Sequence, residues 1–180
     1  MFKRIWQSTL GVLGLSLIAI GQFTAIANWP PFFNQLNVVV ITLIFILFFL
    51  GFRPALWSTL VVGFWLDIFS FNFFGLYLIT FFLVIWAAET ISVRWLTNRS
   101  LYSFLLLIII STAAHNLIWR SLSYLSPDAP AGMFLFQKNF WLALAYQEIW
   151  SMMLAILLFN VSSLLVKRWQ PFFLEKKTIL

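Results

Sequence analysis

Residues 101–125 read LYSFLLLIIISTAAHNLIWRSLSYL, and Arg120 is the only residue among them with a full charge at neutral pH. A helix needs roughly 20 mainly apolar residues to cross the hydrocarbon core of a bilayer. This stretch is therefore long enough and apolar enough to be a transmembrane helix.

The composition of the chain extends this interpretation to the whole protein. Of the 180 residues, 63% are hydrophobic and 9% are charged, whereas a soluble domain has about 25% charged residues. Too few charges remain to cover a water-facing surface, which excludes an ordinary soluble globule, a disordered tail and a fibrous repeat. The sequence predicts an all-α integral membrane protein whose single membrane domain fills residues 1–180. Six spans are predicted, at residues 5–27, 36–50, 55–71, 76–93, 101–125 and 140–166.

Two proline-containing breaks separate the first three spans. Proline donates no helical hydrogen bond and disfavours helix in the residue before it. Boundaries are therefore expected at Pro30-Pro31 and at Gly51-Phe52-Arg53-Pro54. The boundary between the third and fourth spans, Asn72 to Gly75, is the least sharply marked because phenylalanines run through it.

The basic residues are distributed unevenly between the two sides of the predicted membrane. Lys and Arg concentrate in cytoplasmic loops, so both termini are predicted to be cytoplasmic, with a basic tail at residues 167–180. The predicted cytoplasmic set is Lys3, Arg4, Arg53, Arg94, Arg99, Lys167, Arg168, Lys176 and Lys177, against Lys138 and the nearby Arg120 on the exterior side. This topology, rather than nucleic-acid binding, accounts for a pI of about 10.1.

The first span has a second interpretation. Lys3-Arg4, an apolar stretch and Ala25-Ile26-Ala27 together resemble a signal peptide with its small-residue cleavage site. The apolar stretch that begins at Ile5 is much longer than the roughly 7–15 residues of a signal core. We therefore expect an uncleaved helix.

Few charged or strongly polar residues lie within the predicted spans, and each is a functional candidate because charge is costly in hydrocarbon. Helical periodicity puts two polar stripes at comparable depth, which predicts that the third and fifth spans face each other or a common cavity. The stripes are Thr59, Gly63, Asp67 and Ser70 in the third span, and Thr112, His115, Asn116, Trp119 and Ser123 in the fifth, with Arg120 at the border of the latter and Glu148 in the sixth span.

Arg120 is predicted to pair with Asp67, with Glu148 or with both, because an unpaired charge at that depth costs several kcal/mol. Such a pairing either fixes the register of the helices or takes part in binding a ligand or partner, and the sequence leaves both open. A fourth-span carboxylate, Glu89, is expected at the inner interface, paired with Arg94 or Arg53.

No constellation of catalytic, cofactor-binding or metal-ligating residues is visible. The chain has one histidine and no cysteine, so helical H-x-x-x-H zinc ligation and cysteine chemistry are excluded. It also lacks a nucleophile elbow, a P-loop and a dinucleotide fingerprint. We therefore predict a protein that is not an enzyme and holds no cofactor or metal.

One block of sequence resembles a known family. Arg53-Pro54 opens the third span, Gly63-x-x-x-Asp67 lies within it, and Phe74-Gly75-Leu76 starts the next. This pattern resembles the bacterial rod shape-determining protein MreD family, and the length, the six predicted spans and the basic, cysteine-free composition are similar to that family as well. The block covers roughly a fifth of the chain.

The resemblance implies a non-enzymatic scaffold subunit of the cell-elongation machinery in the bacterial cytoplasmic (inner) membrane. The implied partners are an MreC-like protein, MreB-type cytoskeletal filaments and the subunits of a peptidoglycan synthase. Independently of the family, Gly63 would let a neighbouring helix approach closely one turn from Asp67, and Gly75 would suit a tight turn. Arg53 and Pro54 would anchor the start of the third helix at the lipid head groups.

Two other functions are compatible with the sequence. The polar cluster of Asp67, His115, Asn116, Arg120 and Glu148 fits the substrate pocket of a substrate-binding S subunit of an energy-coupling-factor vitamin transporter, which is also a small six-span bundle. The first helix, however, lacks the alanine-x-x-x-alanine spacing through which those subunits dock. An intramembrane hydrolase would require Asp67, His115 or Glu148 to act together in a water-filled cavity.

Overall fold

The computed structural model describes residues 14–17, 20–21, 37–70, 74–96, 100–124 and 138–169, and within these ranges every regular element is an α-helix. The helices with assigned bounds are α2 (Val38–Leu50), α3 (Phe52–Phe69), α4 (Leu76–Trp95), α5 (Leu101–Tyr124) and α6 (Lys138–Trp169). Most of the predicted first span, at residues 5–27, lies outside the described residues, as do residues 170–180 of the predicted tail.

Three helices are long and apolar enough to cross a membrane. They are α4, the Leu101–Ser123 part of α5 and the Trp141–Val161 part of α6. Many large apolar side chains on these helices face outward, for example Trp86, Leu106 and Met153. Lipid is a suitable solvent for such a surface.

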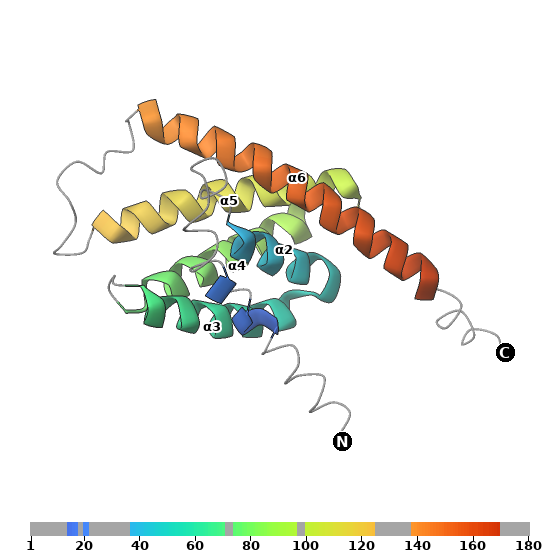
Figure 1. The fold of residues 1–180 in the computed structure, drawn as a ribbon, viewed down its shortest axis with the longest axis horizontal. Coiled ribbons are helices and arrows are strands. Elements are labelled where there is room, and N and C mark those ends of the chain that lie inside the picture. Colours follow the sequence, from blue (N-terminus) through green and yellow to red (C-terminus); the bar gives the residue numbers. More distant parts are fainter. Residues whose placement is uncertain are drawn as a thin grey trace, which may run out of the picture.

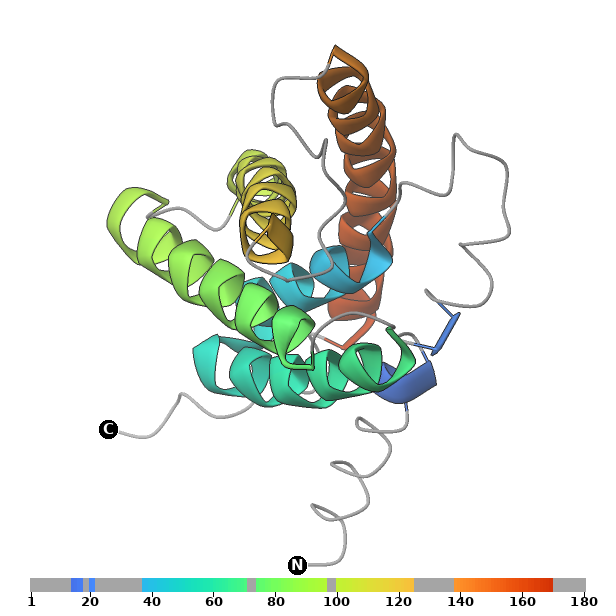
Figure 2. The same cartoon turned by 90° about the vertical axis from the view of Figure 1, so that its left-hand side faces the viewer.

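Helix α2 forms the centre of the bundle. It contacts α3, α4, α5 and α6, and Figure 2 shows it in the middle of these four helices. Its 13 residues give a length of about 20 Å, shorter than the roughly 30 Å hydrocarbon core. Because neighbours surround it, α2 is apolar on all sides; its buried residues are Val39, Val40, Ile41, Leu43, Ile44, Leu47 and Phe48.

Aromatic rings join α2 to the last two helices. The ring centroids of Phe48 and Phe104 are 5.2 Å apart, and those of Phe104 and Phe159 are 5.8 Å apart. Phe49 also lies 6.0 Å from Phe159. These tilted contacts tie α2, α5 and α6 together, and each such pair contributes about 0.5–1.5 kcal/mol beyond its buried area. Helix α6 runs obliquely across the other helices (Figure 1).

The link between α2 and α3 is shorter than the sequence predicts. Only Gly51 is non-helical, and α3 already begins at Phe52, so Pro54 lies inside the first turn. A proline is tolerated there because the first helical N–H groups have no intrahelical partner. Gly51 has φ 96° and ψ −178°, and its N–H donates to the carbonyls of Ile46 and Leu47.

The last helix is longer than the predicted span at residues 140–166. Helix α6 has 32 residues and continues through Lys167 and Arg168 to Trp169. Lysine and arginine are good helix formers, so the basic residues that mark the end of an apolar span need not end the helix. The predicted basic tail therefore begins within α6.

We expect Gly51→Ala to destabilise the bundle by about 1–3 kcal/mol, because its backbone conformation is one that only glycine adopts readily. A Cβ at this position would meet no atom within 4 Å, so the effect arises from the backbone alone. Thermal melting in detergent measures it. Gly14→Ala is the control, since a Cβ there also enters open space. Equal melting temperatures for the two variants would contradict the expectation.

Candidate functional site

Asp67 binds the start of the next helix. It lies in the last turn of α3, two residues before its end, and its side chain is buried, with 3% of its surface exposed. Oδ1 accepts a hydrogen bond from the backbone N–H of Tyr77 at 2.9 Å, and Oδ2 accepts one from Leu78 N–H at 3.2 Å. Both N–H groups belong to the first turn of α4, so Asp67 caps that helix from the preceding one.

This cap replaces one that the chain does not supply locally. The N-cap residue of α4 is Gly75, which has no side chain to accept a hydrogen bond. The first N–H groups of a helix have no intrahelical acceptor and form the positive end of its dipole. A carboxylate satisfies both requirements, and leaving such a buried N–H unsatisfied costs about 1–3 kcal/mol.

Gly63 makes room for the same turn of α4. A Cβ on Gly63 would lie 2.9 Å from the Cα of Leu78, closer than real Cβ atoms approach a backbone atom. Leu78 is thus held at two points, by close contact with Gly63 and by the bond from its N–H to Asp67. The close helix approach predicted at Gly63 is present, and it explains why Gly63 and Asp67 stand one turn apart.

Gly75 has the backbone angles that the sequence predicts. Its φ of 97° and ψ of −8° lie in the left-handed region, which glycine occupies without steric cost. The turn therefore reverses the chain directly into α4, and Ile79 N–H makes the first helical bond to the Gly75 carbonyl at 2.9 Å. Gly63, Asp67 and Gly75 together form one α3–α4 junction.

The other two motif residues lie elsewhere. Arg53 and Pro54 are in the first turn of α3 and are exposed. Asp67 follows Arg53 by fourteen residues, which is about 21 Å along a helix axis. The motif therefore divides into the α3–α4 junction and an exposed Arg-Pro pair at the opposite end of α3.

The polar residues of α5 contact three different helices. Thr112 donates to Glu148 Oε1 of α6 at 2.6 Å, and Asn116 donates through Nδ2 to Gln147 Oε1 of α6 at 2.9 Å. His115 is directed toward α2 and α4 instead, where Asn37 Nδ2 lies 3.3 Å from its Nδ1. Its ring stacks on Phe81 at a centroid distance of 5.1 Å. These contacts hold α5 between α4 and α6.

Some buried polar atoms between α5 and α6 are not satisfied within the described part of the chain. They are Glu148 Oε2 and the hydroxyl oxygens of Ser111 and Ser151. Buried polar groups normally have a partner, so these three oxygen atoms are candidates for binding a polar group. No group of three or more His, Asp or Glu residues in the described ranges is placed to hold a metal ion.

The predicted charge pairs have different outcomes. Pairing of Arg120 with Asp67 or Glu148 stays a prediction, although both Asp67 oxygens already accept backbone N–H groups. The predicted pairing of Glu89 with Arg94 or Arg53 is wrong, because in the described ranges Glu89 forms no ion pair or hydrogen bond. Arg94 follows Glu89 by five residues, which turns their side chains about 140° apart around α4, and Arg53 is exposed.

Two residues with structural roles were missed by the sequence reasoning. Asn37 caps α2, since its Oδ1 accepts a hydrogen bond from Val40 N–H at 3.1 Å. Its side-chain nitrogen, Nδ2, lies against His115. An asparagine directly before an apolar run is an N-cap signal that indicates the first role. Gln147 has no comparable signal, because its partner Asn116 is 31 residues away.

The described structure defines a broad class: an all-helical protein in which three helices can cross a membrane. Comparisons with protein-family models, with curated proteins and with solved structures found no significant match to this chain. A functional assignment therefore rests on the residues and contacts described above.

We expect Gly63→Ala to destabilise the protein by about 1–3 kcal/mol, the usual cost of forcing an extra methyl group into a packed contact. The added Cβ must push the backbone of Leu78 away, and this weakens the bond from Leu78 N–H to Asp67. Thermal melting in detergent is the measurement, with Gly21→Ala as control because a Cβ there enters open space. If both variants had the same melting temperature, α3 and α4 would not be in close contact at this point.

Proposed function

We propose that the chain is a six-span scaffold subunit of the bacterial cell-elongation machinery, with both termini in the cytoplasm and no enzymatic activity of its own. It would lie in the inner membrane and bind an MreC-like protein, peptidoglycan synthase subunits and, through its cytoplasmic side, MreB-type filaments. The observation that carries the proposal is the resemblance of the Arg53-Pro54, Gly63-x-x-x-Asp67 and Gly75 block to the MreD family.

The use of these residues supports a scaffold. Gly63, Asp67 and Gly75 fix α4 against α3. A protein that positions others needs elements held rigidly relative to one another, and a helix cap supplied by a neighbouring helix achieves that.

The placement of the titratable residues also favours binding over catalysis. A hydrolase would need Asp67, His115 or Glu148 to act on one substrate. Asp67 binds the first turn of α4, His115 lies against Asn37 and Phe81, and Glu148 accepts from Thr112. Each of the three residues thus contacts a different group. This arrangement does not favour a hydrolase, in which they would act on one substrate.

A surface for a partner helix is available on α6. Among the exposed apolar residues of α6, five recur at alternating spacings of four and three, which is the pattern of a helix–helix seam. They are Leu142, Tyr146, Ile149, Met153 and Ile156. Transmembrane helices associate through close packing along such a face. We call these five residues the α6 seam and assign it to a membrane-spanning helix of the MreC-like partner.

One observation favours the vitamin-transporter subunit as a second candidate. Glu148 Oε2 and the hydroxyls of Ser111 and Ser151 are buried without hydrogen bonds in the described ranges. A substrate with polar groups would satisfy such atoms. A small molecule that stays bound through purification, together with an ATPase pair that co-elutes, would establish this candidate.

We expect tagged protein, purified from native membranes in mild detergent, to retain an MreC-like protein and peptidoglycan synthase subunits. Ile149→Trp places a bulky ring in the α6 seam and should reduce recovery of the MreC-like protein about tenfold or more, without lowering the melting temperature. Quantitative mass spectrometry of the eluted proteins measures the recovery.

Leu106→Trp is the matched control, because Leu106 is exposed on α5, away from the seam. It should leave recovery unchanged. Elution of an ATPase pair in place of wall-synthesis proteins would overturn the scaffold proposal. Equal recovery with both tryptophan variants would overturn the assignment of the seam while leaving the scaffold proposal intact.

A further inference from the structure

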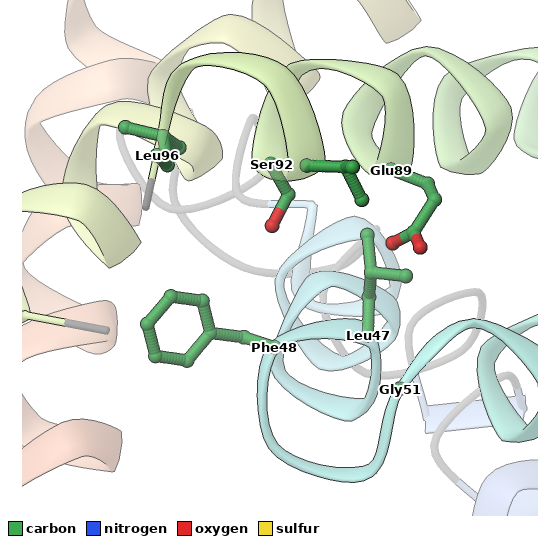
Figure 3. Close-up of a pocket in the computed structure, with 7 residues that line it drawn as sticks. Leu47, Phe48, Gly51, Glu89, Ser92 and Leu96 are labelled. Carbon is green, nitrogen blue, oxygen red and sulfur yellow. The ribbon is translucent and has the colours of Figure 1, made fainter. Parts of the chain in front are cut away.

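A pocket of about 270 Å³ lies where α2 ends and the last turns of α4 pass over it. Leu47, Phe48 and Gly51 form its floor, and Glu89 and Ser92 contribute its polar groups from α4 (Figure 3). The carboxylate and the hydroxyl are both directed toward the α2 side of the pocket. It belongs to neither the α3–α4 junction nor the polar contacts between α5 and α6.

Glu89 brings an uncompensated negative charge to this pocket. Its side chain is half-buried, and within the described ranges it has no hydrogen-bond or ion-pair partner. A partly desolvated carboxylate is stabilised by a cation. Because the other groups that line the pocket are apolar apart from the Ser92 hydroxyl and the Gly51 backbone, the pocket favours a positively charged group.

The polar groups and the volume of the pocket further restrict the class of ligand that fits it. Glu89 and Ser92 offer oxygen acceptors, which suit a primary ammonium because it carries three donors and no acceptor. The volume is slightly below the roughly 300–1,000 Å³ of pockets that hold drug-sized ligands. One head group therefore fits this pocket better than a vitamin or a nucleotide.

Neighbouring residues indicate the depth of the pocket in a membrane. Trp95 ends α4 and Tyr102 lies in the first turn of α5, and each is 82% exposed. Exposed Trp and Tyr at helix ends mark the level of the lipid head groups. The exposed Arg53 follows Gly51, which lines the pocket, by two residues, so a cation for a phosphate lies near the acceptors for an ammonium.

We propose that this pocket binds the primary ammonium of an aminophospholipid head group, with Glu89 and Ser92 as acceptors and the phosphate facing Arg53. Phosphatidylethanolamine has this combination of adjacent charges. A lysine side chain of another protein would supply the ammonium but would leave Arg53 without an anion. Phosphatidylcholine has the phosphate, but its quaternary ammonium has no N–H to donate.

Native mass spectrometry of the delipidated full-length protein tests the proposal, with phosphatidylethanolamine and phosphatidylcholine of identical acyl chains added in turn. The wild type should bind phosphatidylethanolamine about tenfold more tightly, as expected for one hydrogen-bonded charge. Glu89→Gln should remove the preference. Glu175→Gln, which lowers the negative charge equally outside the described residues, should keep it.

A second variant tests the pocket without changing charge. Val93 lies at the rim and is exposed, so Val93→Trp should block entry and also remove the preference, whereas Leu106→Trp should not. Equal binding of the two lipids by the wild type would overturn the proposal, as would a preference that survives in both Glu89→Gln and Val93→Trp. Loss of the preference in Glu175→Gln would show that net charge, and not the pocket, selects the lipid. This experiment measures lipid binding to the purified protein and not the proteins that co-elute with it. Its result is therefore independent of whether the scaffold proposal holds.

Discussion

The hydrogen bonds from the first turn of α4 to the Asp67 carboxylate are the constraint on which the rest of the bundle depends. A helix that starts among apolar neighbours has little water for its free N–H groups, and Gly75 provides no side chain to replace it. Asp67 supplies both acceptors, and Gly63 lets the backbone of Leu78 come close enough to use them. Gly63 and Asp67 therefore act together to fix the start of α4.

The position of α4 carries this constraint to the other helices. Phe81, in the second turn of α4, stacks on His115 of α5, and Tyr77 lies with its ring centroid 6.3 Å from that of Trp119. In the same stretch of α5, Thr112 and Asn116 bind Glu148 and Gln147 of α6. A displaced α4 would therefore disturb α5 first and α6 through it, while α2 maintains the apolar centre.

The residues differ in how far the sequence predicts them. Long apolar runs predict the described helices, and the physical properties of glycine predict the roles of Gly63 and Gly75. The partner of Asp67 was not predictable in the same way, because the sequence suggests a side-chain cation and the structure uses backbone N–H groups, which every residue but proline has. The start of α4 at a glycine without a capping side chain was the available signal. The contact of Asn37 with His115 spans 78 residues and has no local signature.

Amide hydrogen exchange in the first turn of α4 tests the capping role of Asp67 most directly. In Asp67→Ala the N–H groups of Tyr77 and Leu78 lose their acceptors, so their exchange should accelerate about tenfold or more relative to wild type, as expected for a lost cap. Asp67→Asn keeps one acceptor oxygen, so the exchange rates in this variant should lie between those of the wild type and those of Asp67→Ala. Exchange at Leu107 and Ile108 in the middle of α5 should change much less. Unchanged exchange at Tyr77 and Leu78 in Asp67→Ala would contradict the account.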